Sequence, residues 1–119
     1  MEAFRFKNWS VYKEAKGLFM LVVKITHKLP TEYKYTIGDQ IIRSGLSIVL
    51  NIAEGSGKES DKELNRYFNI AMGSVNETLA VIDVLHDLRI ADEEKMEDAE
   101  KLCISISKQL GGFKKKLRK

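Results

Sequence analysis

Residue types that usually carry specialised chemistry are scarce in this sequence. Its 119 residues include one cysteine, one proline and two histidines. A lone thiol, Cys103, cannot form an internal disulfide, which agrees with a reducing compartment. A single proline in a chain that is 44% hydrophobic and 31% charged is typical of a helix-rich globular protein. We therefore expect an ordered, helical chain without disulfide crosslinks.

Long apolar runs are also missing. The longest, Leu18 to Val23, is far shorter than the roughly 20 residues that a membrane-spanning helix needs. The N-terminus, Met1 to Asn8, is polar and charged, whereas a signal peptide would be apolar there. These absences predict a cytoplasmic protein that does not enter a membrane. The length predicts one domain over residues 1–119, because a second core would be too small to be stable.

Basic charge is concentrated in one short segment. The formal net charge is +3, yet residues 1–113 hold 15 basic and 17 acidic side chains. The C-terminal tail, residues 114–119, then adds Lys114, Lys115, Lys116, Arg118 and Lys119. Any attraction to RNA or DNA would therefore concentrate in the tail.

Apolar residues recur at intervals of three and four in four segments, and no alternating apolar and polar run competes with them. The fourth segment has the cleanest stripe, from Met96 to Leu117. The segments cover residues 10–29, 36–54, 60–89 and 92–117. Short connections between long helices imply antiparallel neighbours. The predicted fold class is all-α, an antiparallel up-and-down four-helix bundle.

The segment boundaries carry recognisable signals. Pro30 closes the first helix, and a turn should follow. Thr36 and Ser60 each stand three residues before an acidic residue, which predicts a capping box at the start of the second and third helices. Gly55 is placed to end the second helix in the left-handed conformation.

The second segment differs from a surface helix, because its apolar residues spread around most of the circumference. They include Ile41, Leu46, Val49, Leu50 and Ile52. Either this helix is sandwiched among its neighbours, or another copy of the chain covers its outer face. The second alternative predicts a homo-oligomer.

Two short motifs resemble a known family. They are Ser47-Ile48 followed by Asn51-Ile52-Ala53-Glu54-Gly55, and the stretch from Phe68 to Glu77. With Trp9, Leu29-Pro30 and Glu32, they resemble the four-helix-bundle proteins encoded in intervening sequences of bacterial large-subunit ribosomal RNA genes. The likeness covers about residues 4–90. The positions that carry it in the second and third helices are Gln40, Arg43, Ser47, Asn51, Glu54, Gly55, Gly73, Ser74 and Glu77.

The resemblance implies a ring-like homopentamer of up-and-down bundles with no established biochemical activity. A related group of basic pentameric bundles, similar in fold, binds nucleic acid and a reverse transcriptase. The resemblance therefore adds RNA, DNA or a nucleic-acid enzyme to the partners we expect.

Enzyme chemistry is the least favoured class. A bundle di-iron site needs Glu-x-x-His on two helices, and the nearest match, Asp83-x-x-His86, occurs once. Cys103 lies on the apolar stripe of the fourth segment, where a thiol acts as a small hydrophobe. Residues 55–58 lack the spacing of a phosphate loop. We expect no catalytic residue, metal, cofactor or small-molecule substrate.

The motif residues have structural interpretations as well. Antiparallel packing about residues 55–57 places Arg43 near Glu77, where they either form a charge-assisted pair or remain exposed to solvent. Asn51 and Glu54 can bond to loop backbone or to a neighbouring subunit. Gly73 inside a helix predicts a close backbone approach, opposite small residues of the second helix.

Two functions remain compatible with the sequence. The leading one is a non-enzymatic, self-assembling binding or scaffold module that contacts nucleic acid through its tail, whose copies an oligomer would multiply. The alternative is a purely structural or protein-interaction oligomer. It is supported by the fourth helix, whose acidic start and basic end complement the helix dipole without any ligand. If the tail is not used, Arg5, Lys7, Lys13 and Lys16 are the next candidates.

Overall fold

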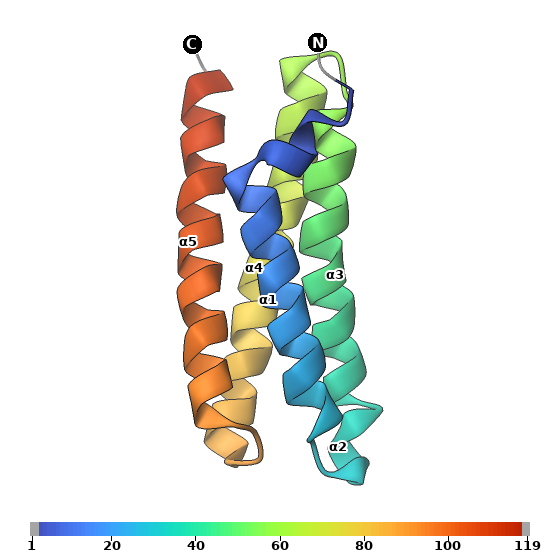
Figure 1. The fold of residues 1–119 in the computed structure, drawn as a ribbon, viewed down its shortest axis with the longest axis vertical. Coiled ribbons are helices and arrows are strands. Elements are labelled where there is room, and N and C mark those ends of the chain that lie inside the picture. Colours follow the sequence, from blue (N-terminus) through green and yellow to red (C-terminus); the bar gives the residue numbers. More distant parts are fainter. Residues whose placement is uncertain (1–2, 118–119) are drawn as a thin grey trace.

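The computed structural model describes residues 3–117, and within them it contains helices and no strand (Figure 1). The helices are η1 (Arg5–Asn8), α1 (Ser10–His27), α2 (Thr31–Lys34), α3 (Ile37–Ser56), α4 (Asp61–Leu88) and α5 (Glu93–Leu117). The predicted all-α class is confirmed, with 86% of the described residues helical.

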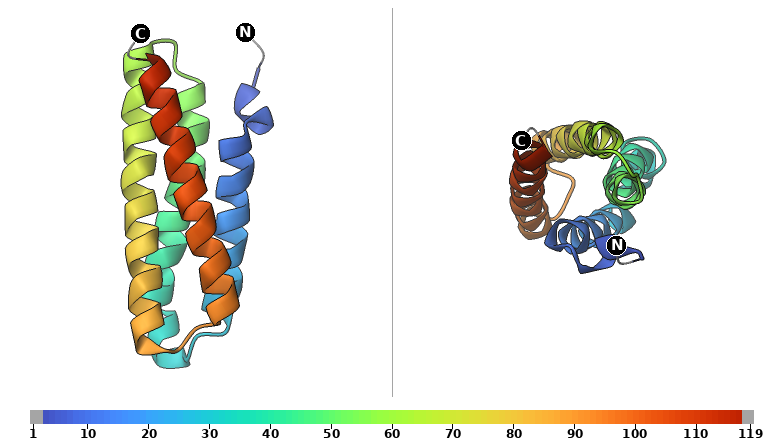
Figure 2. Two further views of the ribbon diagram at one scale, coloured as in Figure 1. Left: turned by 90° about the vertical axis from the view of Figure 1, so that its left-hand side faces the viewer. Right: turned by 90° about the horizontal axis from the view of Figure 1, so that it is seen from above.

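The four long helices alternate in direction along the chain. Seen from one end, they form a ring in the order α1, α3, α4 and α5 (Figure 2). The bundle measures 45 × 22 × 20 Å. Both chain ends and the α3–α4 connection lie at one end of the bundle, and the α4–α5 connection lies at the other. This topology is the predicted up-and-down bundle.

The core is built from one apolar stripe per helix. Phe68 is its largest fully buried side chain. Each stripe has the three- and four-residue spacing read from the sequence, so the helices bury it along their full length. Fully buried examples from the four helices are Leu18, Ile48, Phe68 and Ile106. Buried polar groups are satisfied internally; Thr78 Oγ1, for instance, lies 2.8 Å from Ser44 Oγ.

One predicted boundary holds at α4, and the boundaries around α2 and α3 are corrected. Ser60 Oγ accepts a hydrogen bond from the Glu63 amide at 3.2 Å, so the predicted cap of α4 is present. Thr36 does not cap α3, because its hydroxyl donates back to the Tyr33 carbonyl at 3.3 Å. The turn expected after Pro30 contains the short helix α2 instead, because the Pro30 carbonyl accepts from Tyr33 N at 2.9 Å.

The prediction for Gly55 is wrong. Helix α3 continues through Gly55 to Ser56, and no described glycine has a positive φ. Gly55 is buried, and a Cβ added to it would lie 2.9 Å from the Cβ of Tyr67 on α4. Its function is therefore close helix packing, not chain reversal. The close approach expected at Gly73 is absent, since no atom would lie within 4 Å of an added Cβ there.

Helix α4 is long and apolar enough to cross a membrane, judged by length and composition alone. One window of 18 residues has a mean hydropathy of 1.2, and 33% of that window is buried. A core helix of a globular bundle passes the same test, so this single helix is weak evidence of a span. Its stripe from Leu64 to Leu85 packs into the bundle core.

Replacing Gly55 with alanine should destabilise the protein by about 1–3 kcal/mol, because the new methyl meets the Tyr67 Cβ, which rotation of the side chain cannot remove. Gly112→Ala is the matched control, since Gly112 is helical with open space around it. That change should stabilise the protein by up to about 1 kcal/mol. Urea unfolding followed by circular dichroism measures both. Equal stability of Gly55→Ala and the parent would contradict the close approach.

Candidate functional site

A line of polar contacts runs along the seam between α3 and α4. Ser47 Oγ lies 2.8 Å from Ser74 Oγ, so one hydroxyl donates to the other. Asn51 Nδ2 donates to the Ser47 carbonyl at 2.8 Å. Toward the other end of the seam, Gln40 Nε2 donates to the Glu77 carboxylate. Four of these motif residues thus pair α3 with α4 across the seam, and Asn51 bonds within α3 to one of them.

The predicted pair between Arg43 and Glu77 is not formed. Gln40 is the partner of Glu77, and Arg43 is exposed with no ion pair among residues 3–117. The reason is helical spacing. Gln40, Ser44 and Ser47 follow one another at intervals of four and three on the stripe that faces α4, and Arg43 lies outside it. The solvent-exposed alternative holds for Arg43.

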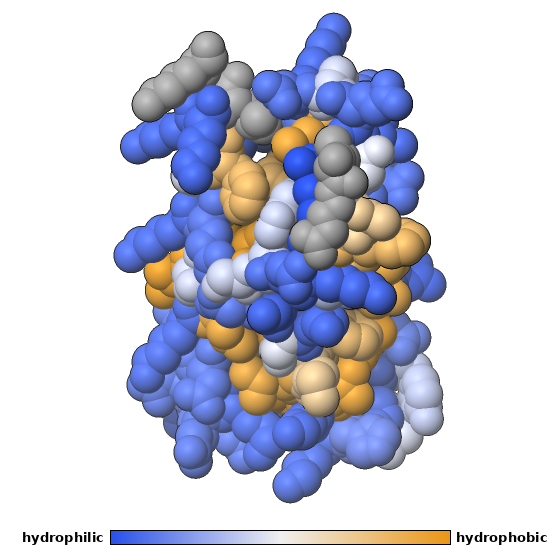
Figure 3. Space-filling model, turned by 45° about the horizontal axis from the view of Figure 1, so that its top comes forward, coloured by the Kyte–Doolittle hydropathy of each residue, from blue (hydrophilic) through white to orange (hydrophobic). Residues whose placement is uncertain are grey.

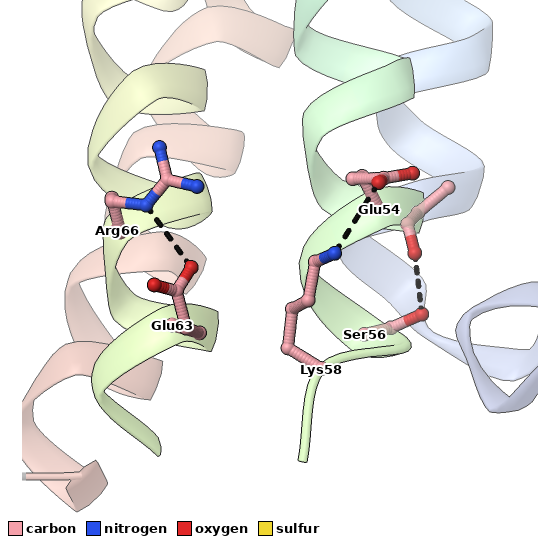
Figure 4. Close-up of polar contacts among 6 residues, drawn as sticks. Glu54, Ser56, Lys58, Glu63 and Arg66 are labelled. Carbon is pink, nitrogen blue, oxygen red and sulfur yellow. Dashed lines mark hydrogen bonds and ion pairs between the residues drawn. The ribbon is translucent and has the colours of Figure 1, made fainter. Parts of the chain in front are cut away.

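Glu54 forms an ion pair instead of binding the loop backbone. Its Oε1 lies 3.5 Å from Lys58 Nζ across the end of α3 (Figure 4). The side chain of Glu54 is 59% exposed, and Asn51 turns back to Ser47. Neither residue therefore contacts loop backbone, which was one of the two alternatives for them. In the same view, Arg66 Nε donates to Glu63 at 3.0 Å on α4.

An aromatic cluster joins three elements at the end of the bundle where the chain ends lie. The Trp9 ring is 5.0 Å from that of Phe113 and 6.1 Å from that of Phe68, measured between centroids. Phe68 and Phe113 meet edge to face at 5.2 Å. We call the end of the bundle that contains Trp9, Phe68 and Phe113 the aromatic end. It fixes the N-terminal segment beside the last turns of α5.

Basic side chains lie over aromatic rings at this end. Arg5 Cζ is 5.3 Å from the Trp9 ring centroid, and Arg5 Nε donates to the Ser56 carbonyl at 3.1 Å. Arg66 Cζ and Lys58 Nζ lie 4.5 and 5.1 Å from the ring centroid of Tyr67. Such cation–π contacts position a charge without neutralising it. These cation–π contacts were not predicted from the sequence. For Arg5 and Trp9, the alternation of basic and aromatic residues at positions 4–9 is the signal that could have indicated one.

The structure places the described part of the basic tail at the aromatic end. Lys114, Lys115 and Lys116 follow Phe113 directly in α5, and the last two are exposed. None of the three has an ion pair within residues 3–117. Arg118 and Lys119 lie outside the described residues. The tail lysines therefore lie at the same end of the bundle as the N-terminal bases, which the sequence separates from them by more than 100 residues.

Charge is segregated between the two ends of the bundle. Residues 3–9 and 111–117 contain five basic and no acidic side chains. Residues 83–100, around the α4–α5 connection at the opposite end, contain eight acidic and two basic side chains. Glu54, Glu59, Asp61 and Glu63 are acidic exceptions near the aromatic end. The repulsion expected from a net-negative body is thus concentrated away from the tail.

Cys103 and His86, the residues considered above for catalysis and metal binding, do not form a common site. Cys103 is buried in α5, and burial together with the nearby Glu100 raises the pKa of its thiol to about 12. His86 Nδ1 lies 3.1 Å from Glu93 Oε2 across the α4–α5 turn. Among the described residues, no three side chains of the metal-ligating types gather at one point. The geometry offers neither an activated nucleophile nor a metal centre at these positions.

Comparisons with known proteins agree with the fold. The model of the family described as 23S rRNA-intervening sequence protein matches residues 7–112. A similar solved structure, from Bacteroides thetaiotaomicron, is described as a protein of unknown function from the S23 ribosomal protein family. It is 26% identical, covers 84% of this chain and 94% of its own, and has a TM-score of 0.77. No curated protein matches.

Cys103 should resist thiol reagents in the folded protein. With a pKa of about 12, its thiolate fraction at pH 8 is on the order of 1 in 10,000, and burial blocks access. Absorbance assay with a disulfide reagent should find about one reactive thiol per chain in denaturing urea and almost none without it. Rapid stoichiometric reaction in native buffer would contradict the buried assignment.

Proposed function

The chain belongs to the family of 23S rRNA-intervening sequence proteins, and from that premise we propose that it is a non-enzymatic, cytoplasmic binding module that contacts nucleic acid. The aromatic end is the contact surface in this proposal. One observation carries it: the tail lysines and the N-terminal bases, distant in sequence, share one end of the bundle, where Trp9 packs on Phe113.

The chemistry of this end fits a polyanion. Lys115 and Lys116 are exposed and have no acidic partner among the described residues, so a phosphate does not have to displace an ion pair. Arg5 and Lys7 add charge on the adjacent N-terminal segment, where no acidic residue occurs between positions 3 and 9. Binding of this kind depends on salt and is insensitive to base sequence. This surface suits three partners: RNA, DNA, or an enzyme with nucleic acid bound to it.

Changing Lys114, Lys115 and Lys116 together to glutamine should weaken binding of labelled single-stranded RNA. For every phosphate that the variant no longer neutralises, the magnitude of the logarithmic salt slope should fall by about 0.7. Fluorescence anisotropy across a salt series measures this. The matched control changes Lys24, Lys28 and Lys34 to glutamine, which removes the same charge at the opposite end of the bundle.

Truncation after Phe113 extends this test to Arg118 and Lys119. It leaves the aromatic cluster in place, so the bundle should remain folded. An equal decrease in affinity for the tail variant and its control would show a general charge effect and no specific surface. Unchanged binding and slope after truncation would transfer the role to Arg5, Lys7, Lys13 and Lys16.

Self-association belongs to the same proposal. Leu46, Leu50 and Ile70 are each more than a third exposed. Leu50 and Ile70 both lie one helical turn toward the α3–α4 connection from the hydrogen bond between Ser47 and Ser74, so they flank one seam. Figure 3 presents a different face of the bundle, where apolar side chains also lie exposed between hydrophilic ones. The outer face of this helix pair therefore suits a second copy of the chain.

Gly73 gives the second indication of assembly. A glycine inside a helix costs up to about 1 kcal/mol relative to alanine, yet nothing in residues 3–117 approaches Gly73 closely. Close approach by a neighbouring subunit would account for it. The number of copies, five, rests on the family resemblance alone.

Leu46→Glu and Ile70→Glu, made separately, should dissociate the assembly, because each places a charge on the proposed contact face. Light scattering should give a multiple of the 13.6 kDa chain mass for the parent and one chain for each variant. Ile104→Glu on α5 is the control, since Ile104 is exposed to a similar degree on another helix. A parent that scatters as 13.6 kDa at micromolar concentration would refute self-assembly.

A purely structural oligomer is the alternative. It is favoured by the existing contacts of Arg5, Lys58 and Arg66, which their aromatic and polar partners already engage. The acidic start and basic end of α5 also complement its dipole. Assembly of the parent without any salt-sensitive RNA binding would select this function.

A further inference from the structure

The N-terminal segment forms a strap across the end of α3. Arg5 holds it there through the hydrogen bond from Nε to the Ser56 carbonyl, and Phe6 packs on Tyr12 at 4.8 Å between ring centroids. A groove of about 800 Å³ lies between the strap and α3. Its apolar lining comes from Phe4, Phe6, Leu50 and Ala53.

Phe4 is the unusual residue of this groove. Its backbone is left-handed, with φ 56° and ψ 39°, which is an outlier for a bulky aromatic residue. Its side chain is nevertheless 70% exposed to solvent, so packing against its own chain does not explain the strained conformation. Strain of this kind concentrates at ligand-binding positions. The ring lies edge to face with that of Phe6, 6.4 Å between centroids, and has Lys7 as its other neighbour.

The rim of the groove is basic. Lys7 Nζ lies 5.7 Å from the centroid of the Phe4 ring, and Arg5 and Lys58 line the groove. Among the described residues, the one carboxylate in the lining is Glu54, which is paired with Lys58 at 3.5 Å. An aromatic face with cations beside it is complementary to a base with its phosphates, because stacking and charge act on adjacent groups of one nucleotide.

We propose that the groove binds an unpaired base of single-stranded nucleic acid, stacked on Phe4, while Lys7 and Arg5 contact the neighbouring phosphates. This inference rests on the proposed function and specifies its ligand. A duplex cannot use the groove, because its bases are already stacked and paired inside the helix. Single strands should therefore bind more tightly than duplexes of the same sequence, beyond what phosphate charge explains.

The test compares a short fluorescein-labelled oligouridine with its duplex, by anisotropy with the full chain. Phe4→Ala should weaken binding of the single strand about tenfold or more and leave binding of the duplex unchanged. Phe4→Trp should restore binding, since it keeps a stacking face. Tyr35→Ala is the matched control, because Tyr35 is also 70% exposed but lies between α2 and α3, at the opposite end.

A second readout places a 2-aminopurine base within the single strand. Stacking on Phe4 should quench its fluorescence in the parent and in Phe4→Trp but not in Phe4→Ala, and circular dichroism checks that each variant is folded. Equal affinity of Phe4→Ala and the parent, with tail-dependent binding intact, would overturn this inference alone. Failure of both nucleic acids to bind the parent at low salt would overturn the proposed function, and this inference with it.

Discussion

The close approach of α3 and α4 at Gly55 is the constraint on which the rest of the structure depends. Because Gly55 has no side chain, Tyr67 packs directly against the α3 backbone, and the connection of residues 57–60 can stay short. This contact fixes the register of the two helices. Down the same seam it aligns Ser47 with Ser74 and Ser44 with Thr78, and at the end it places Tyr67 beside Lys58 and Arg66.

The antiparallel topology converts a chain with little net charge into a polarised body. The chain termini and the acid-rich α4–α5 connection fall at opposite ends, so the short basic segments share one end of the bundle with Trp9 and Phe113, far from most carboxylates. Net charge alone predicted a body that repels phosphates. Net charge says nothing about where the charges lie, and their arrangement in space makes one end of the bundle suited to a polyanion.

Much of the fold was predictable, because helical periodicity is a local property. The four stripes identified the core, including Cys103, and Ser60 marked the start of α4 through contacts within one turn. Where a prediction depended on the neighbour across a helix interface, it failed. Gly55 and Gly73 looked alike as helix glycines, and only the packed structure shows that the first has Tyr67 against it and the second has open space. Similarly, the sequence did not show that Gln40, and not Arg43, is the partner of Glu77.

The sequence by itself determined the helical class, the stripes that form the core and the family, since these depend on spacing and on short motifs. The tertiary structure decided the candidate site. Trp9, Phe68 and Phe113 come from three elements far apart in the chain, and their cluster joins the start of α1, next to the N-terminal bases, to the last turns of α5, next to the tail lysines. Similarly, the strained backbone of Phe4 and the groove beside α3 are found where Arg5 bonds to Ser56, a contact between residues 51 positions apart. Such contacts are non-local, and no periodicity in the sequence encodes them.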